Sequence, residues 1–190
     1  MATEIPNLVW IDCEMTGLSI EKDALVEIAV LVTDSELNII GDGVDVVVKT
    51  SDEQLATMND FVREMHTNSG LLPEIPKGIS IEDAQKQILE YLASAGTTSG
   101  KSPLAGNSVY VDRLFIARDM PALNEYLHYR TIDVSSIKEL ARRWYPKAYF
   151  QAPAKTGNHR ALGDIKDSIA ELAYYRTAVF AQIPEISTPS

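Results

Sequence analysis

The chain has 190 residues, 45% hydrophobic and 23% charged, and these are the length and composition of a single globular domain. Its net charge of −10 argues against binding to long nucleic acids, which require a basic track along their backbone. One cysteine excludes an intrachain disulfide, and no apolar run approaches the roughly 18 residues that span a bilayer. The N-terminus lacks the pattern of a signal peptide, so we expect a cytoplasmic protein without a membrane partner, with one domain over 1–180 and a loose tail over 181–190.

Three apolar segments rich in β-forming residues open the chain, at residues 7–13, 24–33 and 44–50. Turn-forming residues at 16–19 and 41–43 separate them. The pattern predicts three strands joined as an antiparallel meander.

Two helices are predicted next, over residues 52–66 and 80–95. Ser51 or Asp52 is the expected N-cap of the first helix, and Ser80 is the expected N-cap of the second. A loop rich in Gly, Ser and Thr follows the second helix.

Strands and helices alternate in the remainder of the chain. The predicted strands are 104–107 and 130–134, and the predicted helices are 110–119, 135–144 with Ser135 as its cap, and 159–180. Residues 146–158 contain proline and glycine and are predicted as a loop. Strands that come first and then alternate with helices indicate an α/β fold with a mixed sheet.

Asp12 and Glu14 stand two residues apart at the end of the first predicted strand. Side chains at positions i and i+2 point to the same face of a strand, so the two carboxylates lie side by side. A divalent cation removes both their mutual repulsion and the cost of desolvating them. The alternative is a solvated strand end. Cys13 points to the opposite face, where we expect a structural role.

Three more residues are candidates for the same site because each lies near a strand end or a helix start. Asp112 opens the helix after the strand at 104–107, and ligands bind at strand ends in α/β sheets. Asp164 lies near the start of the last helix, and His159 precedes it by five residues, which places the histidine on the loop or at the helix start. The alternatives are an acid that merely stabilises a first helical turn and a histidine with a structural role.

Three segments resemble the motifs of the DEDDh exonuclease family. They are WIDCEMTGL (10–18), GNSVYVDRLFI (106–116) and HRALGDI (159–165), in that order along the chain. The similarity covers residues 7–180, and the flanking segments look like those of the oligoribonucleases within that family. The resemblance implies a ribonuclease H-like fold, in which parallel strands follow the antiparallel meander and helices flank the sheet.

The resemblance also implies the roles of the five candidate residues. Asp12, Glu14, Asp112 and Asp164 match the acids that bind two divalent ions, Mg²⁺ or Mn²⁺, and His159 matches the general base. Four residues separate His159 from Asp164, and this H-x4-D spacing is that of the DEDDh branch. A tyrosine at residues 158–160 would suggest the sister branch, and none is present.

Residues that match the family's nucleotide-contacting positions are Leu18, Phe61 and His66. The resemblance implies that Leu18 wedges between the terminal bases, that Phe61 stacks on a base where many relatives carry Trp, and that His66 contacts a nucleotide. Ordinary core packing is the alternative for Leu18 and Phe61.

Four residues match the family's cap on the 5′ phosphate of the substrate: Ser108, Tyr129, Arg130 and Ser135. In relatives the tyrosine and the arginine come from a second subunit, so the resemblance implies a homodimer. Such a cap would exclude longer chains. The alternatives are that Ser135 is only a helix cap and that Arg130 forms only a surface ion pair.

The positive charge is concentrated in residues 128–160, which hold seven Lys or Arg and two acids, so this segment is +5 and the remainder is −15. A local basic segment suits a small anionic ligand, although a solvated helix with mixed charges is the alternative. Trp144 and Tyr145 lie beside Arg142 and Arg143, a composition enriched at interfaces, and we expect a dimer contact here or core packing of Trp144.

The sequence therefore predicts a 3′–5′ exoribonuclease that hydrolyses very short single-stranded RNA, especially dinucleotides, to 5′-mononucleotides. One alternative is an exonuclease of the same fold that trims DNA or tRNA ends. The other is a non-catalytic nucleotide-binding protein, although all five catalytic positions are filled. A P-loop phosphoryl transferase is disfavoured because the chain has no G-x-x-x-x-G-K-[ST] motif.

Overall fold

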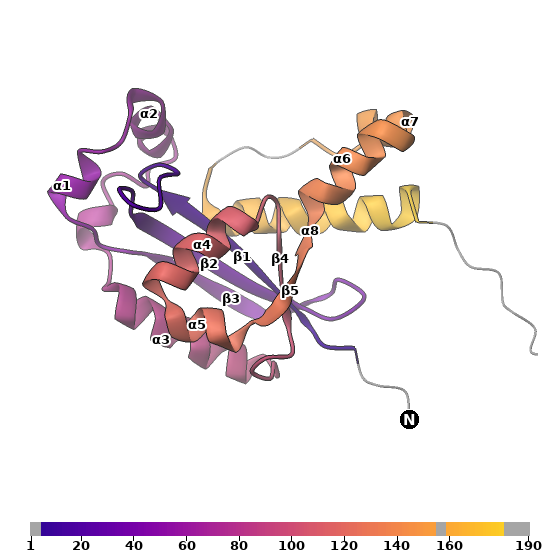
Figure 1. The fold of residues 1–190 in the computed structure, drawn as a ribbon, viewed down its shortest axis with the longest axis horizontal. Helices are drawn as coiled ribbons and strands as arrows, with labels where there is room; N and C mark the ends of the chain where they lie inside the picture. The colour runs from indigo at the N-terminus through magenta and orange to yellow at the C-terminus, as the bar shows by residue number, and fades with distance from the viewer. Residues whose placement is uncertain (1–4, 155–158, 181–190) are drawn as a thin grey trace, which may run out of the picture.

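A computed structural model describes residues 5–154 and 159–180. It contains a five-stranded sheet in the order β3-β2-β1-β4-β5, with helices on both faces (Figure 1). The central strand β1 (Leu8–Met15) pairs antiparallel with β2 (Leu25–Thr33) and parallel with β4 (Pro103–Gly106). The outer strands are β3 (Ile39–Val47) and β5 (His128–Asp133). The predicted α/β fold with a mixed sheet is confirmed, and the tail predicted at 181–190 lies outside the described residues.

The central strands are covered on both faces, and this explains their composition. All nine residues of β2 are buried, as expected for a strand between two layers of helices. Along β1, Val9, Ile11 and Cys13 pack on the side of α3 (Ile81–Ser94) and α4 (Tyr110–Asp119). Trp10 packs on the opposite side, against α8 (Ala161–Ala178).

Alternation along β1 therefore directs Asp12 and Glu14 toward α8, on the same side as Trp10. Trp10 fixes this register, since its ring is fully buried and its Nε1 donates to Thr33 Oγ1 at 2.9 Å. A slip of one residue would place the carboxylates in the apolar layer beneath α4, where they would be desolvated without a partner.

The third strand differs from its prediction. β3 begins at Ile39 rather than 44, and the turn lies at 34–38, where Asp34 Oδ1 accepts from the backbone N–H of Asn38 at 2.9 Å. Gly41 and Gly43, part of the predicted turn, do have the positive φ that glycine tolerates, 75° and 84°. They lie within the strand, beside an irregularity in its pairing with β2.

The helix predicted over 52–66 is two helices, α1 (Asp52–Leu55) and α2 (Asp60–Asn68). Ser51 caps the first, as predicted, and Asn59 caps the second through a bond from Val62 N. An Asn side chain that captures a backbone N–H starts a new helix and interrupts the old one. Ser80 caps α3 as predicted.

Three short helices were not predicted: the 3₁₀ turn Ile75–Lys77, α5 (Pro121–Tyr126) and α7 (Pro146–Phe150), which lies within the predicted loop. Proline commonly interrupts a helix, but in α5 and α7 it occupies the first helical position, where its missing N–H costs nothing. The helix α6 (Val134–Trp144) is capped by Asp133, which accepts from Ser135 N, so the prediction of Ser135 as its cap is wrong. Among the described residues, no helix is long and apolar enough to cross a membrane.

Candidate active site

Three carboxylates meet at the end of β1. Asp12 and Glu14 reach this point from the strand, and Asp164 reaches it from the first turn of α8. One ligand oxygen of each lies within 4.8 Å of the others. The packing of α8 across β1 and β2 brings Asp164 to two residues that precede it by about 150 positions.

Crowding and burial make this cluster unfavourable as a set of anions. Glu14 is buried, and its pKa is raised from 4.5 to about 8, first by desolvation and then by the charges of Asp164, Glu27 and Asp112. A divalent cation would offset the same repulsion. A site built from carboxylate oxygens alone suits a hard cation such as Mg²⁺ or Mn²⁺, so the donor set fits the expected metal.

Asp112 approaches β1 from the other helical layer. Its Oδ1 accepts a hydrogen bond from the backbone N–H of Cys13 at 2.9 Å, beyond the point where β4 stops pairing with β1 at Trp10. Burial is the main cause that raises the pKa of Asp112 to about 7. It is not one of the three carboxylates within 4.8 Å, but its charge contributes to the raised pKa of Glu14. Cys13 is a buried free thiol on the opposite face, as predicted.

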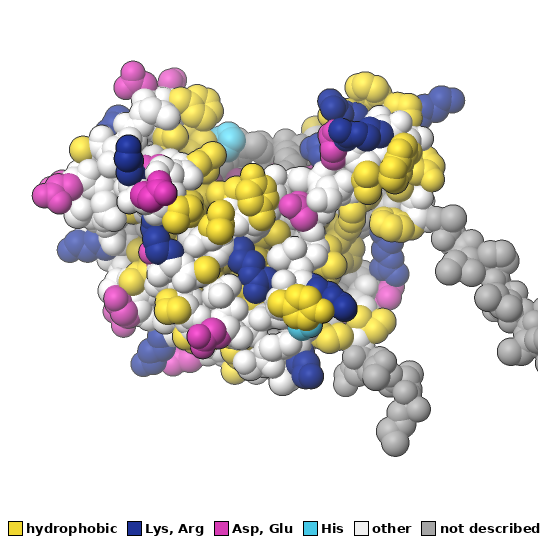
Figure 2. Space-filling model, in the orientation of Figure 1, with side chains coloured by type: hydrophobic (Ala, Val, Ile, Leu, Met, Phe, Trp, Pro, Cys, Tyr) yellow, Lys and Arg dark blue, Asp and Glu magenta, His cyan; other side chains and the backbone are white. Residues whose placement is uncertain are grey.

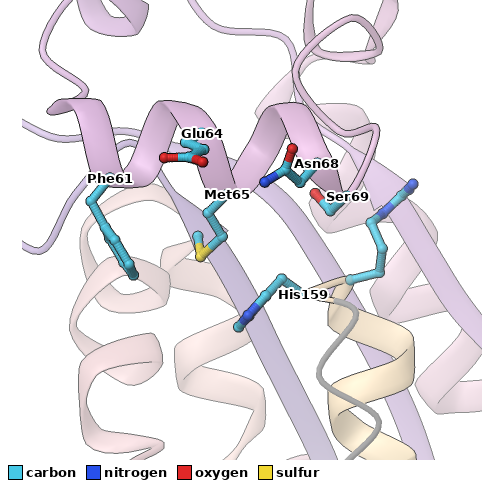
Figure 3. Close-up of a pocket in the computed structure, with 7 residues that line it drawn as sticks. Phe61, Glu64, Met65, Asn68, Ser69 and His159 are labelled. Atoms are coloured by element: carbon cyan, nitrogen blue, oxygen red, sulfur yellow. The ribbon is translucent and has the colours of Figure 1, made fainter.

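His159 lies on the loop just before Arg160, the N-cap of α8, which is one of the two predicted places for it, and its side chain is exposed. Its φ of 49° lies in the left-handed region. It borders a cleft of about 590 Å³ whose opposite wall is α2. Figure 3 shows the ring directed along this cleft, on the side where Phe61 and Met65 point down from α2.

Leu18 and Phe61 are both surface residues. Their exposed fractions are 73% and 74%, so core packing is wrong for both. The loop that carries Leu18 is fixed by Asp23, which accepts from Thr16 Oγ1 at 3.1 Å and from Thr57 Oγ1 at 3.0 Å. Thr57 lies between α1 and α2, so these bonds connect the Leu18 loop to the segment that carries Phe61.

His66 is on α2 and has no exposed surface. Its Nε2 lies 2.9 Å from the carbonyl oxygen of Met15, and its Nδ1 lies 3.9 Å from a carboxylate oxygen of Glu14. Burial lowers the pKa of His66. The ring therefore supports the end of β1 in this arrangement, and its contact with a nucleotide stays a prediction.

The residues matched to the phosphate cap fall into two groups. Ser108 Oγ donates to Ser135 Oγ at 3.2 Å, and Ser135 Oγ donates to the side-chain oxygen of Asn107 at 3.0 Å. Tyr129 and Arg130 are exposed on the edge strand β5, with the guanidinium carbon 5.3 Å from the centre of the tyrosine ring.

Asn107 is a residue of this region that the sequence reasoning missed. Its amide nitrogen donates to Ser168 Oγ at 2.8 Å and to Glu171 at 3.2 Å, so it ties the serine pair to α8. Its place between β4 and Ser108 was the available signal, because side chains at strand ends bind ligands or support residues that do.

Apolar side chains gather on the α6 and α7 end of the molecule, beside lysines and arginines (Figure 2). Trp144 is 66% exposed and Phe150 is 81% exposed, with Leu140 and Tyr145 exposed nearby. Core packing of Trp144 is therefore wrong. An apolar patch of this kind, rimmed by charge, is typical of a surface that another protein covers.

Comparison with known proteins agrees with this geometry. The family model described as Exonuclease matches residues 9–172. Exonuclease I has the same fold, with a TM-score of 0.68 and 18% identity over 92% of this chain, which spans 41% of that longer protein. The zinc-bound E. coli ExoI–ssDNA complex gives a TM-score of 0.71 at 18% identity over the same shares of the two chains.

Three curated relatives are far more similar in sequence, and each is an oligoribonuclease. The one from Streptomyces griseus is 62% identical and the alignment covers 94% of this chain and 89% of the relative. The one from Cutibacterium acnes is 56% identical over 93% and 88%. The one from Mycobacterium avium is 55% identical over 96% and 85%.

The fold and the carboxylate cluster first define a class, that of metal-dependent exonucleases. The chain belongs to the oligoribonuclease family within that class. The predictions of a ribonuclease H-like fold and of a 3′–5′ exoribonuclease that acts on short RNA are confirmed. A non-catalytic nucleotide-binding protein is disfavoured by the same findings.

Proposed function

We propose that this enzyme hydrolyses very short RNA in the cytoplasm, dinucleotides above all, and releases 5′-mononucleotides from the 3′ end with the help of two divalent ions, Mg²⁺ or Mn²⁺. The observation that carries this proposal is the convergence of Asp12, Glu14 and Asp164 within 4.8 Å of one another. The four predicted acids, with Asp112 as the fourth, would hold the ions. When bound, the ions would stabilise the charge that develops on the attacking and leaving oxygens.

His159 is the proposed general base. It takes a proton from the attacking water as that water's oxygen bonds to phosphorus and the bond from phosphorus to the 3′ oxygen breaks. A histidine suits this task at physiological pH. Its exposed position in the cleft lets the ring pass the proton to solvent between turnovers.

Leu18 and Phe61 are the proposed contacts for the bases. Both present apolar surface to solvent, and both lie on segments joined through Asp23 and Thr57. An exposed aromatic ring binds any base by stacking, which favours RNA of every sequence.

Ser108, Ser135, Tyr129 and Arg130 are the proposed cap on the substrate's 5′ phosphate. The two serine hydroxyl groups already donate in series, from Ser108 to Ser135 and from Ser135 to Asn107. A bound phosphate must take over one of these bonds, and a planar guanidinium can add two more. A site closed in this way holds a dinucleotide and excludes longer chains.

We propose that the enzyme works as a homodimer through the apolar patch on α6 and α7. The patch combines exposed Trp144 and Phe150 with arginines, the residue types enriched in interface cores. A second subunit seated here would supply Tyr129 and Arg130 of one protomer to the site of the other, in line with the resemblance.

The experiment that tests the function is a length series of 5′-labelled RNA from two to seven nucleotides with Mg²⁺ or Mn²⁺. We expect the highest kcat/KM on the dinucleotide, a steep fall with length, and no reaction with a chelator. Equal rates on all lengths would remove the cap from the proposal. Faster degradation of DNA or of long RNA would favour the alternative exonucleases.

A further inference from the structure

We infer that Glu27 and Arg160 form a brace that positions His159, which makes Arg160 a positioning residue for the reaction. This inference rests on the proposed role of His159 as the general base. Neither residue belongs to the set predicted from the sequence, and neither is one of the metal-binding acids.

The brace is an ion pair between a fully buried carboxylate and a partly exposed guanidinium. Glu27 lies on β2 directly opposite Glu14 and has no exposed surface. Its Oε1 accepts from Arg160 Nε at 2.8 Å and from Nη2 at 2.7 Å. Its Oε2 accepts from the backbone N–H of Ala161 at 3.0 Å. Both carboxylate oxygens therefore have partners, which a buried carboxylate requires.

The bond to Ala161 gives Glu27 the role of a helix cap. Arg160 is the N-cap residue of α8, and its own side chain makes no capping bond. The carboxylate of Glu27, on another element, takes that place and brings a negative charge to the positive end of the helix. This bond fixes the start of α8 to the sheet at Glu27, the residue of β2 that pairs with Glu14.

A second carboxylate holds Arg160 from the other side. Glu74, which precedes the 3₁₀ turn, accepts from Arg160 Nη2 at 3.1 Å. The guanidinium therefore connects β2 to the segment that follows α2. It also borders the cleft with His159.

The backbone beside the brace is in a conformation that non-glycine residues adopt less often. His159 has a φ of 49°, and a non-glycine residue in the left-handed region costs about 1 kcal/mol or more and persists where neighbours enforce it. The fixed neighbour on its C-terminal side is Arg160. Release of the guanidinium would allow this peptide to relax and the imidazole to leave its place in the cleft.

The test compares Arg160→Ala and Arg160→Gln with Arg176→Ala. Arg176 is a matched control, since it lies on the same helix and pairs with the exposed Glu36. With a 5′-phosphorylated dinucleotide and saturating Mn²⁺, we expect kcat of the Arg160 variants to fall about tenfold to a hundredfold with KM nearly unchanged. Mn²⁺ affinity, measured by calorimetry, should match the wild type. Arg176→Ala should retain full activity.

Two measurements separate positioning from a loss of folding. The chain has three histidines, so their ring protons can be assigned by NMR, and only the His159 signal should shift or broaden in Arg160→Gln. The kcat of the double variant Glu27→Gln/Arg160→Ala should lie within about twofold of the kcat of the slower single variant, because the effects of removing two partners of one contact are not additive. Additive losses with an unmoved His159 signal would overturn the brace.

The outcomes distinguish this inference from the function on which it rests. If His159→Ala is slow but the Arg160 variants match Arg176→Ala, the brace is wrong and the general base stands. If His159→Ala turns over at the wild-type rate, the base role falls and the brace falls with it.

Discussion

The carboxylates at the end of β1 carry the strongest physical signal at the scale of single residues. Glu14 is buried, and the charges of Asp164, Glu27 and Asp112 raise its pKa, whereas the charge of Arg160, which pairs with Glu27, lowers it. An arrangement that is costly without an ion is a preorganised site once the ion is present.

His159→Ala should bind Mn²⁺ and a dinucleotide normally but turn over about a hundredfold or more slowly, because the proposed general base is lost while the acids remain. Single-turnover kinetics would measure the chemical step, and calorimetry would measure both affinities as the control. A lost affinity for Mn²⁺ would instead place the imidazole among the metal ligands.

The raised pKa values predict how the metal-free protein responds to pH. The folded pKa of Glu14 is about 8 and that of Asp112 is about 7, both above their unfolded values of 4.5 and 3.8. The proton on each group stabilises the folded state fully when the pH is below the pKa of the unfolded state. This stabilisation is lost as the pH rises through the pKa of the folded state. In the presence of a chelator, the free energy of unfolding should therefore fall by about a few kcal/mol between about pH 5 and pH 8, which is the size expected from these differences in pKa.

Chemical denaturation across this pH range measures that slope. Glu14→Gln, which cannot ionise, should show a shallower slope than the wild type, and saturating Mn²⁺ should restore stability at high pH. A wild-type slope unchanged in Glu14→Gln would contradict the assignment of the raised pKa to this residue.

At the scale of elements, the loop between β1 and β2 decides where Leu18 lies. A Cβ added at Gly17 would clash with the carboxylate of Asp23, the group that Thr16 and Thr57 hold in place. Gly17→Ala should therefore displace the loop and raise KM for a dinucleotide about tenfold, with a smaller effect on kcat.

The matched control is Ser19→Ala in the same loop, because Asp23 accepts from the Ser19 backbone N–H and not from its side chain. Its KM should equal that of the wild type. An unchanged KM in Gly17→Ala would show that the loop does not contribute to binding.

Local chemistry explains which elements were predictable. Ser51 and Ser80 cap their helices as expected, since a cap depends only on residues within one turn. Gly41 and Gly43 misled the prediction because a positive φ is shared by turns and irregular strands, and only the pairing with β2 distinguishes the two. Ser135 was displaced as the cap by Asp133, whose side chain also accepts from Ser108 N.

The residues of the candidate site also divide into those that the local sequence predicts and those that depend on the folded structure. The carboxylates at 12 and 14 were predictable from strand alternation, whereas Asp112, Asp164 and His159 were only candidates until the resemblance implied their roles. The brace could not be predicted, because Arg160 and Glu27 lie 133 positions apart and meet only when α8 crosses the sheet. The burial of His66 was equally hidden, since its partner is the main chain of Met15.

At the scale of the whole molecule, the apolar patch on α6 and α7 predicts the assembly. Trp144→Glu should convert the proposed dimer to a monomer at micromolar concentration, because it removes a large apolar side chain from the patch and adds a charge that the interface would have to desolvate. Light scattering after size exclusion measures the mass. If Tyr129 and Arg130 act across the interface, kcat/KM for a 5′-phosphorylated dinucleotide should fall in parallel.

Ile5→Glu is the control, since Ile5 is equally apolar and 70% exposed but lies far along the chain from the patch. It should remain dimeric and active. A dimeric Trp144→Glu would place the interface on another surface, and a monomer with full activity would show that one subunit suffices.

The position of α8 in the chain has a consequence for biosynthesis. The helix that supplies Asp164 and follows His159 is the last one described, whereas its partner strand β1 is the first. A nascent chain still emerging from the ribosome has therefore not yet brought together the carboxylates of the candidate site. Until this helix packs on the sheet, the cluster lacks its third carboxylate, Asp164.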